Sequence, residues 1–292
     1  KTTGKTILSS DRGKVLQAVK QQFASLLENN PEVQNAALSA LRKKVQEHYQ
    51  YTPKSIPFEL FQNADDATVE LNEMLSHVGL PLRQEAFVVI GTSDSLAFMH
   101  WGRPVNKFRE GSFPGQSHGF DRDLERMLVL NASDKNVCGG SVSVTGKFGL
   151  GFKSVFLIAD RPRVMSGRLC FEILGGMWPK PLSNDTCVEM KSFMGSVRPS
   201  LRDGTMIMLT NPNCSIDTVL DEFEQLAGIL LAFSRGIKQI DFLKANGTCR
   251  SLAWNGIPLN ETATLSLGQV ELPPDTMPSL LLKITAGRGS LL

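Results

Sequence analysis

The segment ELFQNADDA (Glu59–Ala67) decides the fold of this chain, together with GKFGLGFKS (Gly146–Ser154) about eighty residues later. At about 100° per residue, Glu59, Asn63 and Asp66 fall within roughly 60° of arc on one side of a helix. Apolar residues crowd another sector, and they are Leu60, Phe61, Ala64, Ala67, Leu71 and Leu75. We therefore predict an amphipathic helix with one face in a core and the other face available for chemistry.

Composition indicates a globular protein without a strong charge signature. The 292 residues are 41% hydrophobic and carry a formal net charge of +2, which is too small to indicate a nucleic-acid-binding surface. No apolar run approaches the roughly 18 residues of a membrane span. The five cysteines form no C-x-x-C pair and are odd in number, so neither a zinc site nor a disulfide framework is predicted. We expect no membrane contact and a reducing compartment, the cytoplasm or alternatively the nucleus. Because the chain does not begin with Met, we also expect it to be part of a longer protein.

Proline and glycine positions divide the chain into helices and strands. The helix that carries Glu59 follows Pro53 and Pro57, which suit a first helical turn. Residues 91–95 separate two short apolar runs and predict a hairpin. The predicted elements are helices over 11–28, 31–49, 57–76, 121–130, 154–158 and 217–233, strands over 87–90, 96–99, 163–165, 169–174, 205–209 and 237–243, and short strand candidates after 247.

Each of the two opening segments, taken alone, is more simply explained by a structural role than by a functional one. Successive amides of a glycine-rich loop that opens into a helix can cradle phosphate groups. Gly149 and Gly151 are nevertheless more simply loop glycines that need positive φ or close packing. A stripe of Glu, Asn and Asp on a helix is more simply a solvated face.

The two segments together resemble a known ATPase superfamily in their order and spacing. They resemble the N-box and the glycine-rich box of the GHKL superfamily. This superfamily comprises the Bergerat-fold ATPases of gyrase, heat-shock chaperone, histidine kinase and MutL type. Within it, the two segments are most similar to the sacsin and No Vein branch. A third element, RDGT (Arg202–Thr205) before a strand, resembles the Gly-Thr that ends the site beside adenine in this superfamily. The resemblance covers roughly Pro53 to Leu243.

The resemblance implies a fold class and a domain organisation. We expect an α/β chain, more closely an α+β two-layer sandwich with the Bergerat ATP-binding fold, in which helices cover one face of a mixed, mostly antiparallel sheet. The ATP-binding domain would span 51–243, with a lid at about 105–145. An N-terminal helical extension at 1–50 would precede this domain, and a β-rich extension or a following domain at 244–292 would come after it. Glycine and serine around 111–115 support a movable lid.

Residue by residue, the resemblance implies a hydrolytic site that uses Mg²⁺. Glu59 matches the general base that takes a proton from the attacking water, and Asn63 matches the side chain that ligates Mg²⁺. Asp66, one turn further along, would steady the nucleotide end of the helix. Asp65 points about 120° away from Glu59, and we expect it to be a surface or supporting residue.

The glycine box would act mainly through its backbone, because a side chain at its glycines would hold the backbone away from phosphate oxygens. Its lysines and the preceding Lys135 could offset phosphate charge, with exposed and solvated lysines as the alternative. The rings of Phe148, Phe152 and Phe156 are expected in the core. The predicted nucleotide-binding residues of this region are Lys135, Gly146, Lys147, Phe148, Gly149, Leu150, Gly151, Phe152 and Lys153.

The sequence departs from the superfamily at the predicted base pocket. The box usually written D-x-G-x-G is represented by HWGRP (His100–Pro104), so the aspartate that accepts a bond from the adenine amino group in typical relatives is missing. His100 could replace it as an acceptor through a neutral ring nitrogen or a water, or it could be an ordinary histidine at a strand end. Gly102 still fits the box, Thr205 fits the Gly-Thr element, and Trp101 is expected in the core.

The implied function is Mg-dependent ATP binding and hydrolysis by a module of a larger protein, in which lid closure serves a chaperone-like or defence-like machine. Turnover is expected to be slow and to depend on partners or dimerisation. The expected partners are ATP, other domains of the same chain and, in the presence of nucleotide, a second copy. The alternative is a nucleotide-binding module with little hydrolysis, which the altered base pocket makes plausible. A histidine-kinase activity is disfavoured because His48 lacks the usual phospho-acceptor surroundings, and Glu59 favours hydrolysis.

Overall fold

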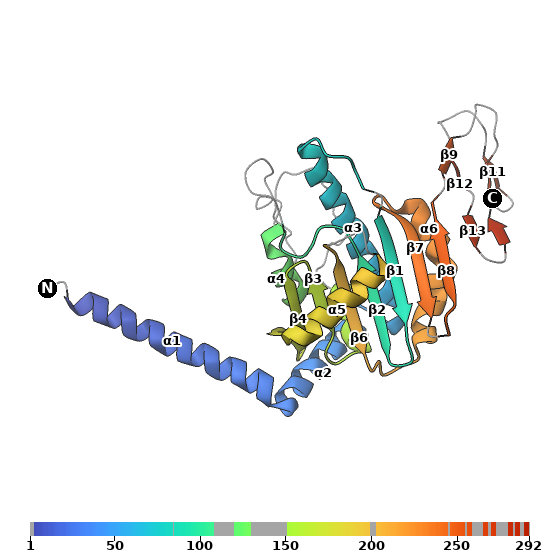
Figure 1. Cartoon of the computed structure of the whole chain (residues 1–292). Coiled ribbons are helices and arrows are strands. Elements are labelled where there is room, and N and C mark those ends of the chain that lie inside the picture. Colours follow the sequence, from blue (N-terminus) through green and yellow to red (C-terminus); the bar gives the residue numbers. More distant parts are fainter. Residues whose placement is uncertain are drawn as a thin grey trace.

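The computed structural model places the elements shown in Figure 1. The residues it describes are 3–83, 85–107, 120–129, 151–198, 203–244, 246–254 and six short strands within 256–291. Part of the predicted lid and most of the glycine box fall outside these ranges. The predicted site residues outside them are Lys135, Gly146, Lys147, Phe148, Gly149 and Leu150.

Eight strands of the described chain form one mixed sheet. They are β1 (Glu85–Gly91), β2 (Ser95–His100), β3 (Arg163–Ser166), β4 (Leu169–Leu174), β5 (Trp178–Pro181), β6 (Thr205–Thr210), β7 (Ile237–Lys244) and β8 (Cys249–Ala253). The strand order is β5-β4-β3-β6-β2-β1-β7-β8. Only β1 and β7 pair in parallel, and the other neighbours in this sheet are antiparallel. The prediction of a mixed, mostly antiparallel sheet in an α+β chain is confirmed.

The C-terminal part forms short antiparallel pairs, β10 with β11, β12 with β9, and β13 with β14. These pairs lie within 244–292, the part of the chain that the sequence predicts to be a β-rich extension or a following domain. The main sheet continues past residue 243, because β8 pairs with β7 along its whole length. The bounds are β9 (Gly256–Pro258), β10 (Leu265–Leu267), β11 (Val270–Leu272), β12 (Leu280–Leu282), β13 (Ile284–Ala286) and β14 (Gly289–Leu291).

The helices form where the apolar spacing predicts them, with one addition, α5. They are α1 (Thr3–Asn29), α2 (Pro31–Glu47), α3 (Ile56–His77), α4 (Asp123–Leu128), α5 (Asn184–Val197) and α6 (Ile216–Phe233), with 3-10 helices η1 (Pro53–Ser55), η2 (Phe120–Arg122) and η3 (Gly151–Leu157). The helix predicted over 154–158 is instead the 3-10 helix η3, which begins within the glycine box at Gly151. Gly79, two residues after the end of α3, has a φ of +69°, which glycine adopts without strain, and the Leu80 amide donates back to the Leu75 carbonyl.

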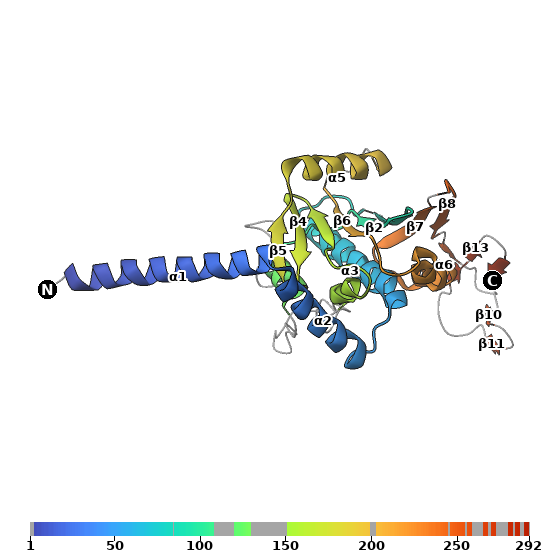
Figure 2. The ribbon, with the colours of Figure 1, turned by 90° about the horizontal axis from the view of Figure 1, so that it is seen from below.

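One face of the sheet is covered by α2, α3, α6 and η3 (Figure 2). Because side chains alternate along a strand, Phe87 and Val89 of β1 point into this core, where the Phe87 ring packs against Phe61 of α3 and Phe223 of α6. The α2 helix belongs to the same core through Leu41 and its apolar neighbours. The α1 helix extends away from the body of the molecule (Figure 1).

The opposite face of the sheet is covered by α5 (Figure 2). Val88 of β1 and Met99 of β2 pack there with Met190 and Met194 of α5. The prediction that helices cover only one face is therefore wrong. Its physical reason is that every residue of β1 is buried, so both faces of this strand are apolar and both need a cover.

Candidate functional site

Glu59 and Gly151 bring the two opening segments together. Glu59 lies in the first turn of α3, which packs against η3. A Cβ atom built on Gly151 would collide with the carboxylate of Glu59. A side chain at this position would force the Glu59 carboxylate to move, and the predicted base lies directly against the last glycine of the predicted phosphate-binding loop.

The surroundings of Glu59 favour a proton acceptor. Burial raises the pKa of its carboxyl group, and a side-chain hydrogen bond from Tyr51 partly opposes the rise. Burial, the negative charge of Glu59 and, least, the same hydrogen bond raise the pKa of Tyr51 to about 12. Sequence reasoning missed Tyr51, because it lies between α2 and η1 and belongs to no motif; nothing in its local pattern points to Glu59.

Of the other three polar residues of α3 that the sequence singles out, one is exposed and two hold structure. Asn63 is exposed, one turn after Glu59. Asp66 is buried and pairs with Arg235 at 2.6 Å. Asp65 is also buried, and its carboxylate accepts the backbone amides of Arg235, Gly236 and Ile237 at 3.0, 2.8 and 2.8 Å. Asp65 is therefore a supporting residue at the start of β7, and the alternative of a surface residue is wrong.

A magnesium site at Asn63 fits what the structure shows of this residue. The amide oxygen of an exposed asparagine, one helical turn after a carboxylate, is a suitable ligand for a hard cation that keeps most of its other ligands as water or phosphate oxygen. Within the described ranges, no three His, Cys, Asp or Glu side chains gather as a metal-binding group. A cation here would depend on Asn63 and on ligands that the nucleotide brings.

Lys153 is fully buried, which is unusual for a lysine. Its Nζ donates to the backbone carbonyl of Met127 in α4 at 2.6 Å, and burial lowers its pKa to about 8. Phe152 lies in the core with its ring edge against Phe156, as predicted. We refer to Glu59, Asn63, Gly151 and Lys153 as the phosphate side of the candidate site.

We refer to His100, Gly102 and Thr205, the residues that the sequence predicts near the base, as the base pocket of the candidate site. His100 ends β2 and Thr205 begins β6, and the two are direct partners across these strands. A Cβ on Gly102 would lie 2.7 Å from the backbone of Ala67 and Thr68, so only glycine lets the chain after β2 pass this close to α3. The base pocket thus lies against the helix that carries Glu59.

The hydrogen bonding of His100 makes it a donor. Its Nδ1 accepts the backbone amide of Gly102 at 3.3 Å. Burial and the nearby Arg103 lower the pKa of His100 to about 4, so the ring is neutral at pH 7. With Nδ1 acting as acceptor, the proton is assigned to Nε2. In this arrangement His100 is not the acceptor that the missing aspartate would be.

Ser166 is part of the base pocket and was missed by sequence reasoning. Its hydroxyl lies 2.6 Å from that of Thr205 and accepts the backbone amide of Val105 at 2.8 Å. Strand β3 places it there, because Ser166 pairs directly with Thr205 across β3 and β6. A serine at a strand end has no local signal, so only the sheet register could have identified it.

A cleft of about 620 Å³ lies at the other end of β2. It is lined in part by Thr92 and Asp94 of the β1–β2 turn, Ile216 at the start of α6, and Lys244 at the end of β7. None of the residues that line it belongs to the phosphate side or to the base pocket. The cleft is therefore separate from the candidate site.

Comparison with models of known protein families gives no match, and comparison with curated protein sequences gives none either. None of the helices in the described part of the chain combines the length and apolar content that crossing a bilayer requires.

Proposed function

We propose that this chain is a GHKL-type ATPase module with the Bergerat fold, which binds Mg-ATP and hydrolyses it. The observation that carries the proposal is the contact of Gly151 with Glu59. It joins the candidate base to the end of the glycine box, across about ninety residues of sequence. The pairing of His100 with Thr205 supports it, because it brings the other two boxes together beside the same helix.

In this function Glu59 accepts the proton of the attacking water. A half-buried carboxylate with a raised pKa is a stronger base than an exposed one. Asn63 would hold Mg²⁺, which neutralises charge on the phosphate oxygens when it is bound. The amides of the glycine box would hold the phosphates, and Lys153 would lie beside them.

The remaining parts of the proposal concern the larger protein. Closure of the segment around 105–145 would exclude water from the site. Slow turnover would drive motion of other domains of the same chain, or nucleotide-dependent pairing of two copies, in a chaperone-like or defence-like machine in the cytoplasm.

The test compares Glu59→Gln and Asn63→Ala with the wild-type chain in assays of Mg-ATP binding and phosphate release. We expect Glu59→Gln to bind Mg-ATP within about threefold of wild type and to lose at least about 100-fold in turnover. Asn63→Ala should weaken binding only when Mg²⁺ is present. The matched control is Glu222→Gln, an exposed carboxylate that pairs with Lys54. Unchanged turnover in Glu59→Gln would refute the proposed base.

A second candidate function is nucleotide binding with little hydrolysis. The observation that favours it is the donor character of His100, which differs from the acceptor of typical relatives. Binding of Mg-ATP by the wild-type chain without measurable phosphate release would select this function.

A further inference from the structure

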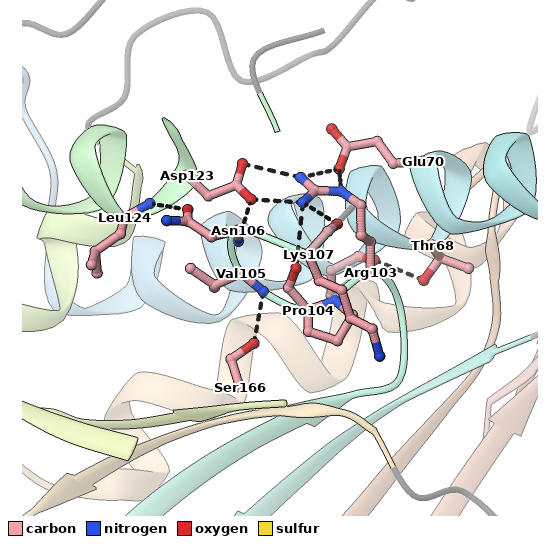
Figure 3. Close-up of polar contacts among 11 residues, drawn as sticks. Thr68, Glu70, Arg103, Pro104, Val105, Asn106, Lys107, Asp123, Leu124 and Ser166 are labelled. Atoms are coloured by element: carbon pink, nitrogen blue, oxygen red, sulfur yellow. Dashed lines mark hydrogen bonds and ion pairs between the residues drawn. The ribbon is translucent and has the colours of Figure 1, made fainter. Parts of the chain in front are cut away.

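Arg103, directly after the base pocket, is the centre of a buried ion network (Figure 3). Its side chain is 5% exposed. Its Nε and Nη2 contact one oxygen of Glu70 on α3 at 2.9 and 2.8 Å, and Nη1 and Nη2 bind the two oxygens of Asp123 on α4 at 2.7 and 3.0 Å. The guanidinium also lies 4.0 Å above the ring of Phe120. One cation therefore ties α4 to α3.

The network also orders the chain that leads to α4. The Asn106 amide donates to Asp123 at 2.8 Å, and the Asn106 side chain accepts the amide of Leu124 at 2.9 Å. The guanidinium donates to the carbonyls of Pro104 and Lys107 at 3.3 and 3.1 Å. A bidentate ion pair between an arginine and a carboxylate fixes the relative orientation of the two groups as well as their distance. The start of α4 is thus held in one geometry.

The C-terminal turn of α4 holds Lys153. The Met127 carbonyl, four residues after Asp123, accepts the Lys153 amine, and Gly151, two residues before Lys153, lies against Glu59. The contacts run from α3 through Arg103 and α4 to η3 and back to α3. The base pocket and the phosphate side are connected through Arg103.

We propose that Arg103 is a positioning residue of the nucleotide site: by pairing with Asp123 it fixes α4, and the Met127 carbonyl of α4 fixes the amine of Lys153, two residues after Gly151. This inference rests on the proposed function and specifies the part of the nucleotide that is involved. Arg103 supports binding of the triphosphate and not of the base.

The test uses Asp123→Asn in the full 292-residue chain, with Glu70→Gln as the matched control. Each change removes one carboxylate charge from Arg103, but only Asp123 lies on α4. We expect Asp123→Asn to weaken binding of both Mg-ATP and Mg-triphosphate about tenfold, and Glu70→Gln to change either by less than about threefold. Hydrogen exchange of residues 120–129, measured without nucleotide, should rise in Asp123→Asn alone.

A double-mutant cycle separates positioning from general destabilisation. If α4 acts through Lys153, adding Asp123→Asn to Lys153→Met should cause no further loss of Mg-triphosphate affinity. If the losses of Mg-triphosphate affinity in Asp123→Asn and Lys153→Met multiply in the double variant, the proposal is overturned. Equal effects of Asp123→Asn and Glu70→Gln on binding would also overturn it. Failure of the wild-type chain to bind Mg-ATP would overturn the proposed function and this inference together. The exchange measurement would then still report whether Arg103 anchors α4.

Discussion

Replacing Lys153 by Met should stabilise the fold near neutral pH and weaken phosphate binding. Lys153 is fully buried, and its amine has the Met127 carbonyl as its hydrogen-bond acceptor. Burial lowers its pKa from 10.5 to about 8. In the unfolded chain the amine keeps its proton up to about pH 10.5, whereas in the folded chain it loses the proton near pH 8. Between these values the unfolded state binds more protons, so the wild-type free energy of unfolding rises with pH.

The magnitude follows from the two pKa values. At about 1.4 kcal/mol per unit, the drop from 10.5 to about 8 means that the charged amine lowers stability by about 3 kcal/mol at pH 7. Methionine removes this cost but leaves the Met127 carbonyl without its donor, a loss of about 1 kcal/mol. Lys153→Met should therefore be about 2 kcal/mol more stable than wild type at pH 7, and the advantage should fall to about zero at pH 10.

The assay is urea unfolding of wild type and Lys153→Met at pH 7 and pH 10, followed by fluorescence. Every other titrating group is common to both chains, so the difference between them isolates the amine. Lys54→Met, which removes an exposed lysine, controls for the general effect of one positive charge. A difference between wild type and Lys153→Met that does not change with pH would refute the argument that the buried amine carries a desolvation cost.

Two further changes test the packing that builds the site. Gly102→Ala should lower the free energy of unfolding by about 2 kcal/mol, because the alanine Cβ would lie 2.7 Å from the backbone of Ala67. Gly195→Ala, in open space on α5, should instead raise the free energy of unfolding slightly. Equal effects of the two changes in urea unfolding would contradict this prediction. Asp65→Ala should cost about 3 kcal/mol in the same assay because three amides at the start of β7 lose their acceptor, whereas Asp65→Asn, which keeps one oxygen, should lose about 1 kcal/mol.

The elements that sequence predicted correctly are those whose signals are local. The α3 helix has an apolar face of helical period, a proline in its first turn and a glycine after its end, and all three are readable within about twenty residues. The β1–β2 hairpin has the same advantage. The contact between Glu59 and Gly151 was also predictable, but only through the order of the boxes, since no local rule joins residues this far apart.

The features that sequence missed depend on contacts made by the complete fold. The α5 helix has a serine N-cap, Ser183, and methionines four residues apart, yet its role follows only from a second apolar face of the sheet. Ser166 and Tyr51 reach the site through strand register and through the chain after α2. In the sequence Arg103 looks like an ordinary charged loop residue. Only the fold shows that α3 and α4 place a carboxylate on either side of it.

The same contacts suggest where base specificity lies if the chain binds a nucleotide. His100 uses its acceptor nitrogen on Gly102, so it offers a ligand an N–H, and both adenine and guanine carry acceptors for such a donor. The hydroxyls of Ser166 and Thr205 share one hydrogen bond, and Ser166 accepts the Val105 amide. Whichever hydroxyl donates, one hydrogen is left over. Because this hydrogen can turn toward different acceptors, the hydroxyl pair suits adenine and guanine alike, so base specificity would lie in groups other than His100 and this pair.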